Sequence, residues 1–310
     1  MTPIVRLDKV LQRMSLFTPA RTLLEKIVMS RTEPCGVPGV NYLEPLGDPG
    51  IFGPASVTWR VLSNPGRVFI GGITAVLLEL AEPRVRSGVW DHTNFRKDPV
   101  GRMQRTGLAA MVVAYGNTRD AEAAMSRIRR VHEGITGLTP DGQPYRANDP
   151  DLLTWVHVTA VYGFLNAYLR YVNPGLTRPE QDRFYTESLK VCRYYGINWA
   201  PSSVTEVETY FEGMRTILRH HEILEQFLGL VLNTPVLSAA ALPVQRFLIQ
   251  AAIDLLPPWA RELLRLENGQ RLRVAMRPVV GAIVTLAGRL LSNGPPQQAR
   301  HRMATANGRE

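Results

Sequence analysis

The amino-acid sequence predicts an all-α fold in a single large helical domain. Residues that begin helices recur along the chain, whereas no alternating run of β-branched residues lasts more than a few positions. The chain has 310 residues, 45% of them hydrophobic, which is enough for a substantial core. We find no internal repeat and no convincing boundary between two folding domains.

Helix starts are the clearest local signals. Asp98-Pro99 and Asp149-Pro150 each combine a capping carboxylate with proline at the first helical position. The segments 177–180 and 205–208 both fit the capping box, in which a threonine and a glutamate satisfy each other's backbone donors. Gly196 is expected to end the helix that begins at residue 177. The predicted helices cover residues 4–14, 19–30, 54–62, 65–80, 99–115, 118–134, 150–172, 177–195, 205–219, 221–232, 238–254, 258–266 and 271–291.

Four segments are expected along the chain. Residues 1–44 form an N-terminal helical arm followed by an irregular segment rich in glycine and proline, and residues 45–260 form the main helical domain. Residues 261–292 contain a C-terminal helix that is both basic and apolar. Residues 293–310, rich in proline, glutamine and arginine, are expected to be a disordered tail.

The charge distribution argues against a nucleic-acid-binding protein. The formal net charge is +9, but most of the excess comes from arginines after residue 259, and no basic run is interleaved with aromatic residues. Cys35 and Cys192 lie far apart and lack metal or redox spacing, as expected of reduced thiols in the cytoplasm. The N-terminus lacks the apolar core of a signal peptide, so export is not expected.

The most membrane-like stretch is residues 274–291, which Arg277, Pro278 and two glycines interrupt. We favour a core helix for this stretch. The alternative is a peripheral membrane contact through residues 271–291, on the inner face of the membrane, with flanking arginines toward lipid headgroups.

Two histidines lie on helix faces that are otherwise apolar. His132 shares a face with Met125 and Ile128, and His157 shares a face with Leu153 and Phe164. An imidazole in such a place can bind iron through one nitrogen while the other donates to an oxygen. The alternative is that each histidine only satisfies a local hydrogen bond.

Basic and acidic side chains near these helices extend the candidate site. Arg102, Arg105 and Thr106 lie one turn apart at the start of a helix, and guanidinium groups suit a ligand with two carboxylates such as haem. The alternative is a solvated face paired with Asp98. Glu82, like the nearby Glu79, follows an apolar helix and is a candidate base. His92, expected in a loop, is a further candidate for proton transfer. The candidate catalytic residues are therefore Arg102, Arg105, Thr106, Glu82 and His92.

Five segments carry a resemblance to a known family. They are Phe52–Arg60, Gly88–Arg96, Asp98–Thr106, Val131–His132 and Tyr145–Thr159. Together they resemble the bacterial MpaB-type oxygenase family, which shares its catalytic domain with the latex-clearing proteins, haem-dependent dioxygenases that cleave polyisoprene. The resemblance spans roughly residues 45–260.

The resemblance implies a globin-like helical core around non-covalent haem b, held by a proximal histidine. We assign His132 to that role first and His157 second. Arg102 and Thr106 match the family's Arg-x-x-x-Thr element, and Arg105 stands where latex-clearing proteins can place a distal lysine. Because a guanidinium group is not deprotonated, Arg105 is not expected to coordinate iron. Many relatives carry His-Pro where this chain has Glu82-Pro83.

The function expected from these observations is a haem b-dependent oxidoreductase that uses dioxygen on an apolar substrate, isoprenoid or otherwise lipid-like, in a cavity walled by Leu108, Val112 and Phe164. One alternative is a non-catalytic helical protein of the same fold that has lost the cofactor and binds lipid or a membrane surface. Another is a non-haem iron enzyme that uses His132, His157 and a carboxylate. The sequence specifies neither the substrate nor the oligomeric state.

Overall fold

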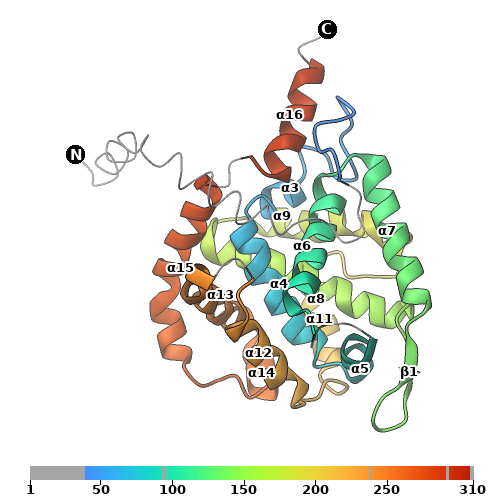
Figure 1. The fold of residues 1–310 in the computed structure, drawn as a ribbon, viewed down its shortest axis with the longest axis vertical. Coiled ribbons are helices and arrows are strands. Elements are labelled where there is room, and N and C mark those ends of the chain that lie inside the picture. The colour runs from blue at the N-terminus through green and yellow to red at the C-terminus, as the bar shows by residue number, and fades with distance from the viewer. Residues whose placement is uncertain (1–38, 93–94, 96, 237–238, 291–292, 308–310) are drawn as a thin grey trace. The chain divides into compact units, whose positions relative to one another are not determined.

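The structure of the protein, a computed structural model, describes residues 39–92, 95, 97–236, 239–290 and 293–307 (Figure 1). Chain contacts divide the protein into two compact units, 1–33 and 34–310, and all described residues belong to the second. The predicted segments 45–260 and 261–292 both lie in that unit, whereas the helices expected at 4–14 and 19–30, and Cys35, lie outside the described residues.

Within the described residues the fold is helical apart from one short hairpin, which confirms the all-α prediction. The helices are α3 (Val57–Val61), α4 (Pro65–Glu79), α5 (Pro83–His92), α6 (Pro99–Tyr115), α7 (Thr118–Glu133), α8 (Pro150–Tyr171), α9 (Arg178–Ser188), η3 (Leu189–Val191), α10 (Cys192–Tyr195), α11 (Val204–Met214), α12 (Ile223–Asn233), η4 (Ala239–Ala241), α13 (Leu242–Leu255), α14 (Pro258–Leu263), α15 (Gln270–Leu290) and α16 (Pro295–Asn307). Strands β1 (Thr136–Leu138) and β2 (Pro144–Arg146) pair antiparallel.

Helices α4 and α8 pack closely against each other along the core (Figure 1). Two glycines allow this approach: a Cβ atom on Gly163 would lie 2.2 Å from the carbonyl oxygen of Gly71. Such a distance is far below van der Waals contact, so the two backbones touch where a side chain would separate them. Residues on the facing surfaces of α4 and α8 therefore lie close together over the length of both helices.

The remaining helices surround this pair. Helix α6 packs against α7 and contacts α4, while α13 and α15 cover α4 elsewhere. Helix α3 is tied to the end of α6 by two reciprocal hydrogen bonds, because Trp59 Nε1 donates to the Ala114 carbonyl at 2.8 Å and Tyr115 Oη donates to the Trp59 carbonyl at 2.7 Å. Both aromatic side chains are fully buried. These bonds fix the C-terminal end of α6 in the core.

Most predicted helix starts agree with the structure. Asp98 and Asp149 accept backbone hydrogen bonds at the starts of α6 and α8, and Thr177 with Glu180 forms a capping box. The predicted start at Thr205 is wrong. Helix α11 begins at Val204 because the hydroxyl of Ser203 accepts the hydrogen bond from the Glu206 backbone amide.

Two elements were not predicted. Helix α5 begins at Pro83, directly after Glu82, whose carboxylate accepts a hydrogen bond from the backbone amide of Val85 at 2.7 Å. Glutamate is not a typical N-cap residue, so the usual signal was missing. His92, expected in a loop, is the last residue of α5. The segment between α7 and α8, expected to be a loop, forms the β1–β2 hairpin.

The prediction of a disordered tail over residues 293–310 is wrong for residues 295–307, which form α16. The reason is Arg302, which is fully buried and donates to the backbone carbonyls of Tyr42, Asp48 and Tyr115. Glycine, proline and glutamine in this segment suggested disorder, but one side chain with several carbonyl partners orders the helix.

Helix α8 is the one helix among the described residues that is long and apolar enough to cross a membrane. Most of its apolar window is buried inside the protein, as is typical of the core helix of a globular domain. Helix α15, the stretch singled out from the sequence, does not meet the same criteria of length and composition.

Candidate functional site

The partly buried carboxylate of Glu79, at the end of α4, is the centre of the site. Glu79 Oε1 lies 3.5 Å from the Thr159 hydroxyl of α8, which also lies 3.0 Å from the Trp155 and Val156 carbonyl oxygens. Burial raises the pKa of Glu79 to about 7, although the positive charge of Arg102 and the Thr159 hydroxyl act in the opposite direction. Near neutral pH this carboxyl can therefore exist in both protonation states, which is the property required of an acid or base.

Arg102 of α6 is the charged neighbour of Glu79. Burial lowers the pKa of Arg102, the Glu79 carboxylate raises it, and the nearby Arg105 lowers it. The Arg102 guanidinium donates to the Thr106 hydroxyl one turn further along α6, and that hydroxyl donates to the Arg102 carbonyl at 3.0 Å. Thr106 thus holds the Arg102 side chain in place along the helix.

His132 of α7 also lies within electrostatic range of Arg102. Burial lowers the pKa of His132, the positive charge of Arg102 lowers it further, and the Asn148 side chain acts in the opposite direction. The imidazole is therefore neutral at neutral pH. Its Nδ1 atom is buried without a hydrogen-bond partner, and so is Oδ1 of Asn148. The Asn148 amide nitrogen donates to the Arg129 carbonyl at 3.0 Å, which leaves Oδ1 as the acceptor beside the imidazole.

His157 lies on α8 in a different environment. Its Nε2 is 3.1 Å from the Ser188 hydroxyl and 3.8 Å from the Cys192 sulfur, next to a small apolar cluster. The Ser188 hydroxyl donates its proton to the Tyr185 carbonyl at 2.6 Å, so it accepts the hydrogen bond from Nε2–H of His157. Burial lowers the pKa of His157 to about 4. This histidine satisfies local hydrogen bonds and shares none of its contacts with His132.

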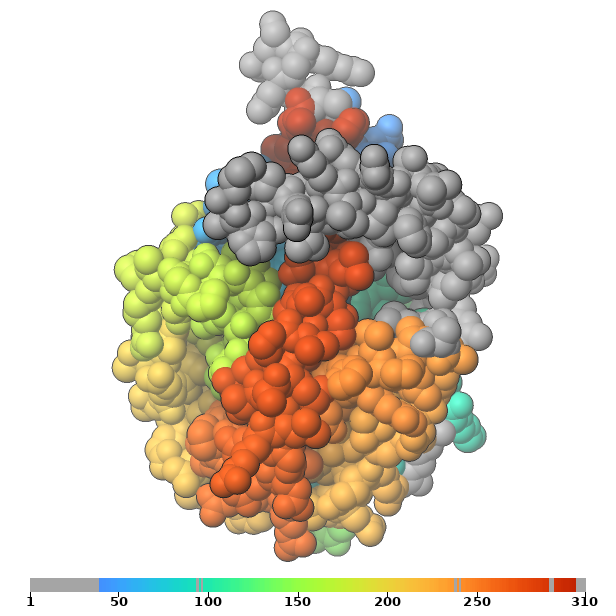
Figure 2. Space-filling view, turned by 90° about the vertical axis from the view of Figure 1, so that its left-hand side faces the viewer, coloured from blue at the N-terminus to red at the C-terminus, as the bar shows by residue number. Residues whose placement is uncertain are grey.

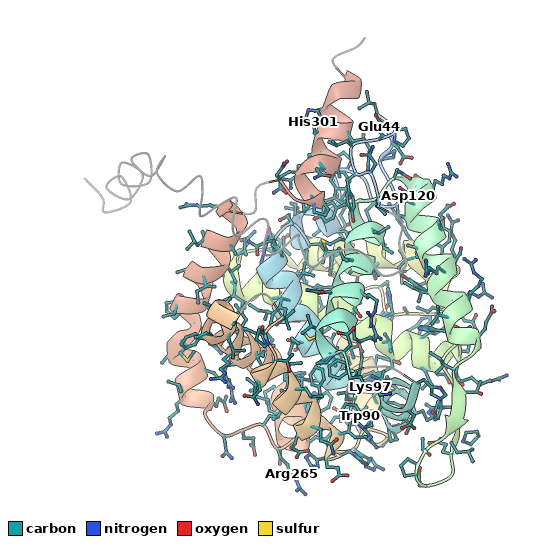
Figure 3. All side chains as sticks on the ribbon, viewed as in Figure 1. Glu44, Trp90, Lys97, Asp120, Arg265 and His301 are labelled. Atoms are coloured by element: carbon teal, nitrogen blue, oxygen red, sulfur yellow. The ribbon has the colours of Figure 1, made fainter. Side chains whose placement is uncertain are left out.

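Arg105 lies at the surface end of the site. Its guanidinium pairs with the Asp98 carboxylate at 3.2 Å, and Asp98 also caps α6 through the amide of Gly101. Both side chains are partly accessible, so this pair contributes little to stability. Lys97, just before α6, is exposed (Figure 3). Arg105 is therefore a solvated arginine paired with Asp98, which was the alternative considered from the sequence. Arg102 instead interacts electrostatically with Glu79 and His132.

Glu82 and His92 lie away from Arg102. Glu82 is fully buried, accepts a hydrogen bond from Arg84 Nε at 2.7 Å and caps α5. It lines a cavity of about 220 Å³ together with Trp155, Trp199 and Tyr210. His92 is exposed, and its Nε2 lies 3.1 Å from the Tyr145 hydroxyl on β2. Glu82 thus stabilises the start of α5, and His92 connects the end of α5 to the hairpin.

The structure thus brings together Arg102, Thr106 and His132, and adds Glu79, Thr159 and Asn148. From the sequence, Glu82 was preferred to Glu79 as the candidate base, because Glu82-Pro83 stands where many relatives carry His-Pro. A sequence signal for Glu79 does exist, since it lies one turn after the buried Ala75 on the face that packs into the core. Thr159 lies one turn after the buried Trp155 in the same way.

The described residues hold no group of three histidine, cysteine or acidic side chains placed to bind a metal ion. His132, His157 and a carboxylate do not converge, so the ligand set of the non-haem alternative is not assembled. What the described site offers an iron centre is a single neutral imidazole near the Arg102 guanidinium, which also interacts electrostatically with Glu79.

The chain was compared with protein families, curated proteins and solved structures. The family model described as "ER-bound oxygenase mpaB/B'/Rubber oxygenase, catalytic domain" matches residues 59–285, which is more than half of the chain. The chain belongs to this oxygenase family. No curated protein and no solved structure matches it significantly.

Membership of the mpaB/rubber oxygenase family confirms the resemblance read from the sequence and identifies the chain as an oxygenase domain. As an oxygenase, it uses dioxygen on a small-molecule substrate. The matched residues run from the middle of α3 to α15, past the expected limit at residue 260, and contain every residue of the site described above.

Proposed function

We propose that this oxygenase binds haem b through His132 and oxidises an apolar, lipid-like substrate. The observation that carries the proposal is the environment of His132: a half-buried imidazole whose pKa is lowered by burial and by the nearby Arg102, and whose Nδ1, like Oδ1 of the neighbouring Asn148, has no hydrogen-bond partner among the described residues. His157 is not proposed as a ligand, since its Nε2 already donates to Ser188.

The residues present fit a haem iron on chemical grounds. Metal binding requires the unprotonated imidazole, and burial together with Arg102 favours that form. Histidine ligands commonly donate their second ring N–H to a carbonyl, which fixes the tautomer and the ring orientation. Asn148 Oδ1 is an acceptor without a partner at that place, and it would take the Nδ1 proton. The unpaired atoms of His132 and Asn148 then satisfy each other, and Nε2 is left as the ligand.

The other polar residues have distinct roles in this proposal. Haem b supplies the redox chemistry with dioxygen when it is bound. Arg102, half-buried on α6, provides a positive charge and hydrogen-bond donors for an anionic group in the site. Glu79, with a pKa near 7, takes up or returns a proton at its carboxylate, and the Thr159 hydroxyl orients that carboxylate. Arg105, at the accessible end of α6, is placed for an anionic group such as a propionate.

Apolar side chains next to the polar site support an apolar ligand. Met103 and Met111 of α6 and Val156 and Phe164 of α8 are partly buried and pack against the core. Leu108, expected to wall the cavity, is also partly buried, whereas Val112 is fully buried. Methionine and aromatic side chains adapt to irregular apolar shapes, which suits a flat macrocycle and a lipid-like substrate.

Haemin titration of the purified chain tests the proposal. Wild-type protein should bind one equivalent and develop a Soret band, and His132→Ala should lose that band. His157→Ala is the matched control and should bind haemin like wild type, because His157 of α8 bonds to Ser188 of α9 and not to the residues around His132. Circular dichroism checks that each variant is folded.

Three outcomes would contradict the proposal. Loss of the band in His157→Ala with retention in His132→Ala would exchange the two assignments. A folded, colourless wild type that takes up no haemin would favour the non-catalytic alternative. One equivalent of iron without porphyrin absorbance would favour a non-haem enzyme.

A further inference from the structure

Helix α15 presents an unusual apolar face to solvent. Of the twelve large hydrophobic residues that are exposed among the described residues, four lie on this helix: Leu272, Val274, Val279 and Leu286, with exposed fractions of 65%, 42%, 50% and 51%. The helix runs along the face of the molecule shown in Figure 2, where it is coloured orange-red. Exposed apolar residues are normal when scattered, but a contiguous set on one element indicates an interaction site.

Three of these residues form a continuous apolar stripe together with two alanines. Leu272, Ala275, Val279, Ala282 and Leu286 follow each other at intervals of three and four residues, and all are exposed. Residues at this spacing lie on one side of a helix. The opposite side, which includes Val280 and Val284, is buried against the protein. The stripe therefore continues over four turns on the outer side of α15.

The charges of α15 are all positive. The helix from Gln270 to Leu290 contains four arginines and no acidic residue. Arg277 pairs with the buried Asp254 carboxylate at 2.7 Å, and Arg273 is buried against backbone carbonyls. Arg271 and Arg289, at the two ends of the stripe, are exposed, and neither makes an ion pair with another described residue. Two exposed cations thus flank the apolar stripe, with no acidic partner in the described part of the chain.

We propose that the outer face of α15 docks on an anionic membrane surface, with the helix lying in the plane of the interface. The stripe from Leu272 to Leu286 would enter the boundary between headgroups and acyl chains, while Arg271 and Arg289 reach the lipid phosphates. The charges argue against pairing with α15 of a second copy. In either orientation such a pair would place arginine beside arginine, and α15 has no acidic residue to compensate.

The proposal is independent of haem, so its test does not depend on the function proposed above. Full-length protein is sedimented with vesicles of pure phosphatidylcholine and with vesicles that also contain 30% phosphatidylglycerol. Wild type should bind the anionic vesicles and bind the neutral ones at least tenfold more weakly. The variant Arg271→Gln/Arg289→Gln should lose about 30-fold in affinity for anionic vesicles, from two cations near a charged surface.

Apolar substitutions separate docking from general surface hydrophobicity. The variant Leu272→Ser/Val279→Ser/Leu286→Ser should lose binding by more than tenfold. A matched control, Val131→Ser/Leu138→Ser/Val172→Ser, removes equally exposed apolar residues elsewhere and should bind like wild type. Thermal unfolding and circular dichroism confirm that the variants are folded.

Four results would overturn the proposal. Two of them concern wild type, which would either fail to bind anionic vesicles or bind both vesicle types equally. In the third, the control variant would lose as much binding as the α15 variant. A dimer in light scattering that the α15 variant converts to monomer would show that the stripe binds a second copy instead.

Discussion

Glu79 gives the most specific prediction, because burial has displaced its titration into the neutral range. In the unfolded chain this carboxyl titrates near its ordinary value of 4.5, whereas in the folded protein its pKa is about 7. Between these values the folded state holds a proton that the unfolded state has lost, so the free energy of unfolding falls as pH rises. A difference of about 2.5 units corresponds to about 3 kcal/mol, since one unit is worth 1.36 kcal/mol.

Substitution of Glu79→Gln removes this titration and keeps the shape of the side chain. The free energy of unfolding of the variant, relative to wild type, should increase by about 3 kcal/mol between pH 4.5 and pH 7.5. Arg102 loses its negative neighbour in the variant, but guanidinium stays charged over this range, so its effect is a constant offset.

The measurement is urea unfolding of both proteins at several pH values, followed by tryptophan fluorescence. Other groups titrate equally in the two proteins and cancel in the difference. Glu208→Gln is the control, because Glu208 is 68% exposed, and its difference from wild type should be small and independent of pH. Parallel pH profiles for wild type and Glu79→Gln would refute the claim that Glu79 is buried and protonated near neutral pH.

Four further predictions follow from single contacts. Burial lowers the pKa of His157 to about 4, so the free energy of unfolding of wild type should fall by about 3 kcal/mol more than that of His157→Gln as pH falls from 6.5 to 4. The same pH dependence of unfolding in both proteins would contradict this prediction. Asn148→Ala should weaken haemin binding about 10- to 100-fold in a titration, and unchanged affinity would remove its proposed role beside His132. Arg302→Ala should lower the free energy of unfolding by on the order of 3 kcal/mol in urea, since several buried carbonyls lose their donor; a change below the error would contradict this. Gly163→Ala should lower the free energy of unfolding by about 1–3 kcal/mol, because the added methyl group pushes α8 away from α4. Gly72→Ala, whose added methyl group meets no atom within 4 Å, should be neutral or stabilising.

Much of the fold was accessible from local sequence signals. Asp98 and Asp149 predict helix starts because a side-chain cap followed by proline is a local arrangement that depends on few distant contacts. Helix α16 shows the limit of such reasoning. Its order depends on Arg302, whose acceptors lie more than 180 residues earlier in the chain. Composition describes the segment itself and says nothing about such distant partners.

The candidate site was accessible only in part. Periodicity placed His132 and His157 on apolar faces, but it could not distinguish them, because the difference lies in Asn148 for one and Ser188 for the other. Glu79 and Arg102 meet because α4 and α6 pack against each other, which depends on tertiary structure. Glu82 looked equally suitable in the sequence, yet its carboxylate caps α5.

The proposal that His132 binds the iron can be tested by cavity rescue. His132→Gly is reconstituted with haemin, and its spectrum is recorded with and without added imidazole. We expect the variant to lack the spectrum of the wild-type complex and imidazole to restore it, whereas His157→Gly should need no imidazole. A wild-type spectrum in His132→Gly without imidazole would contradict the claim.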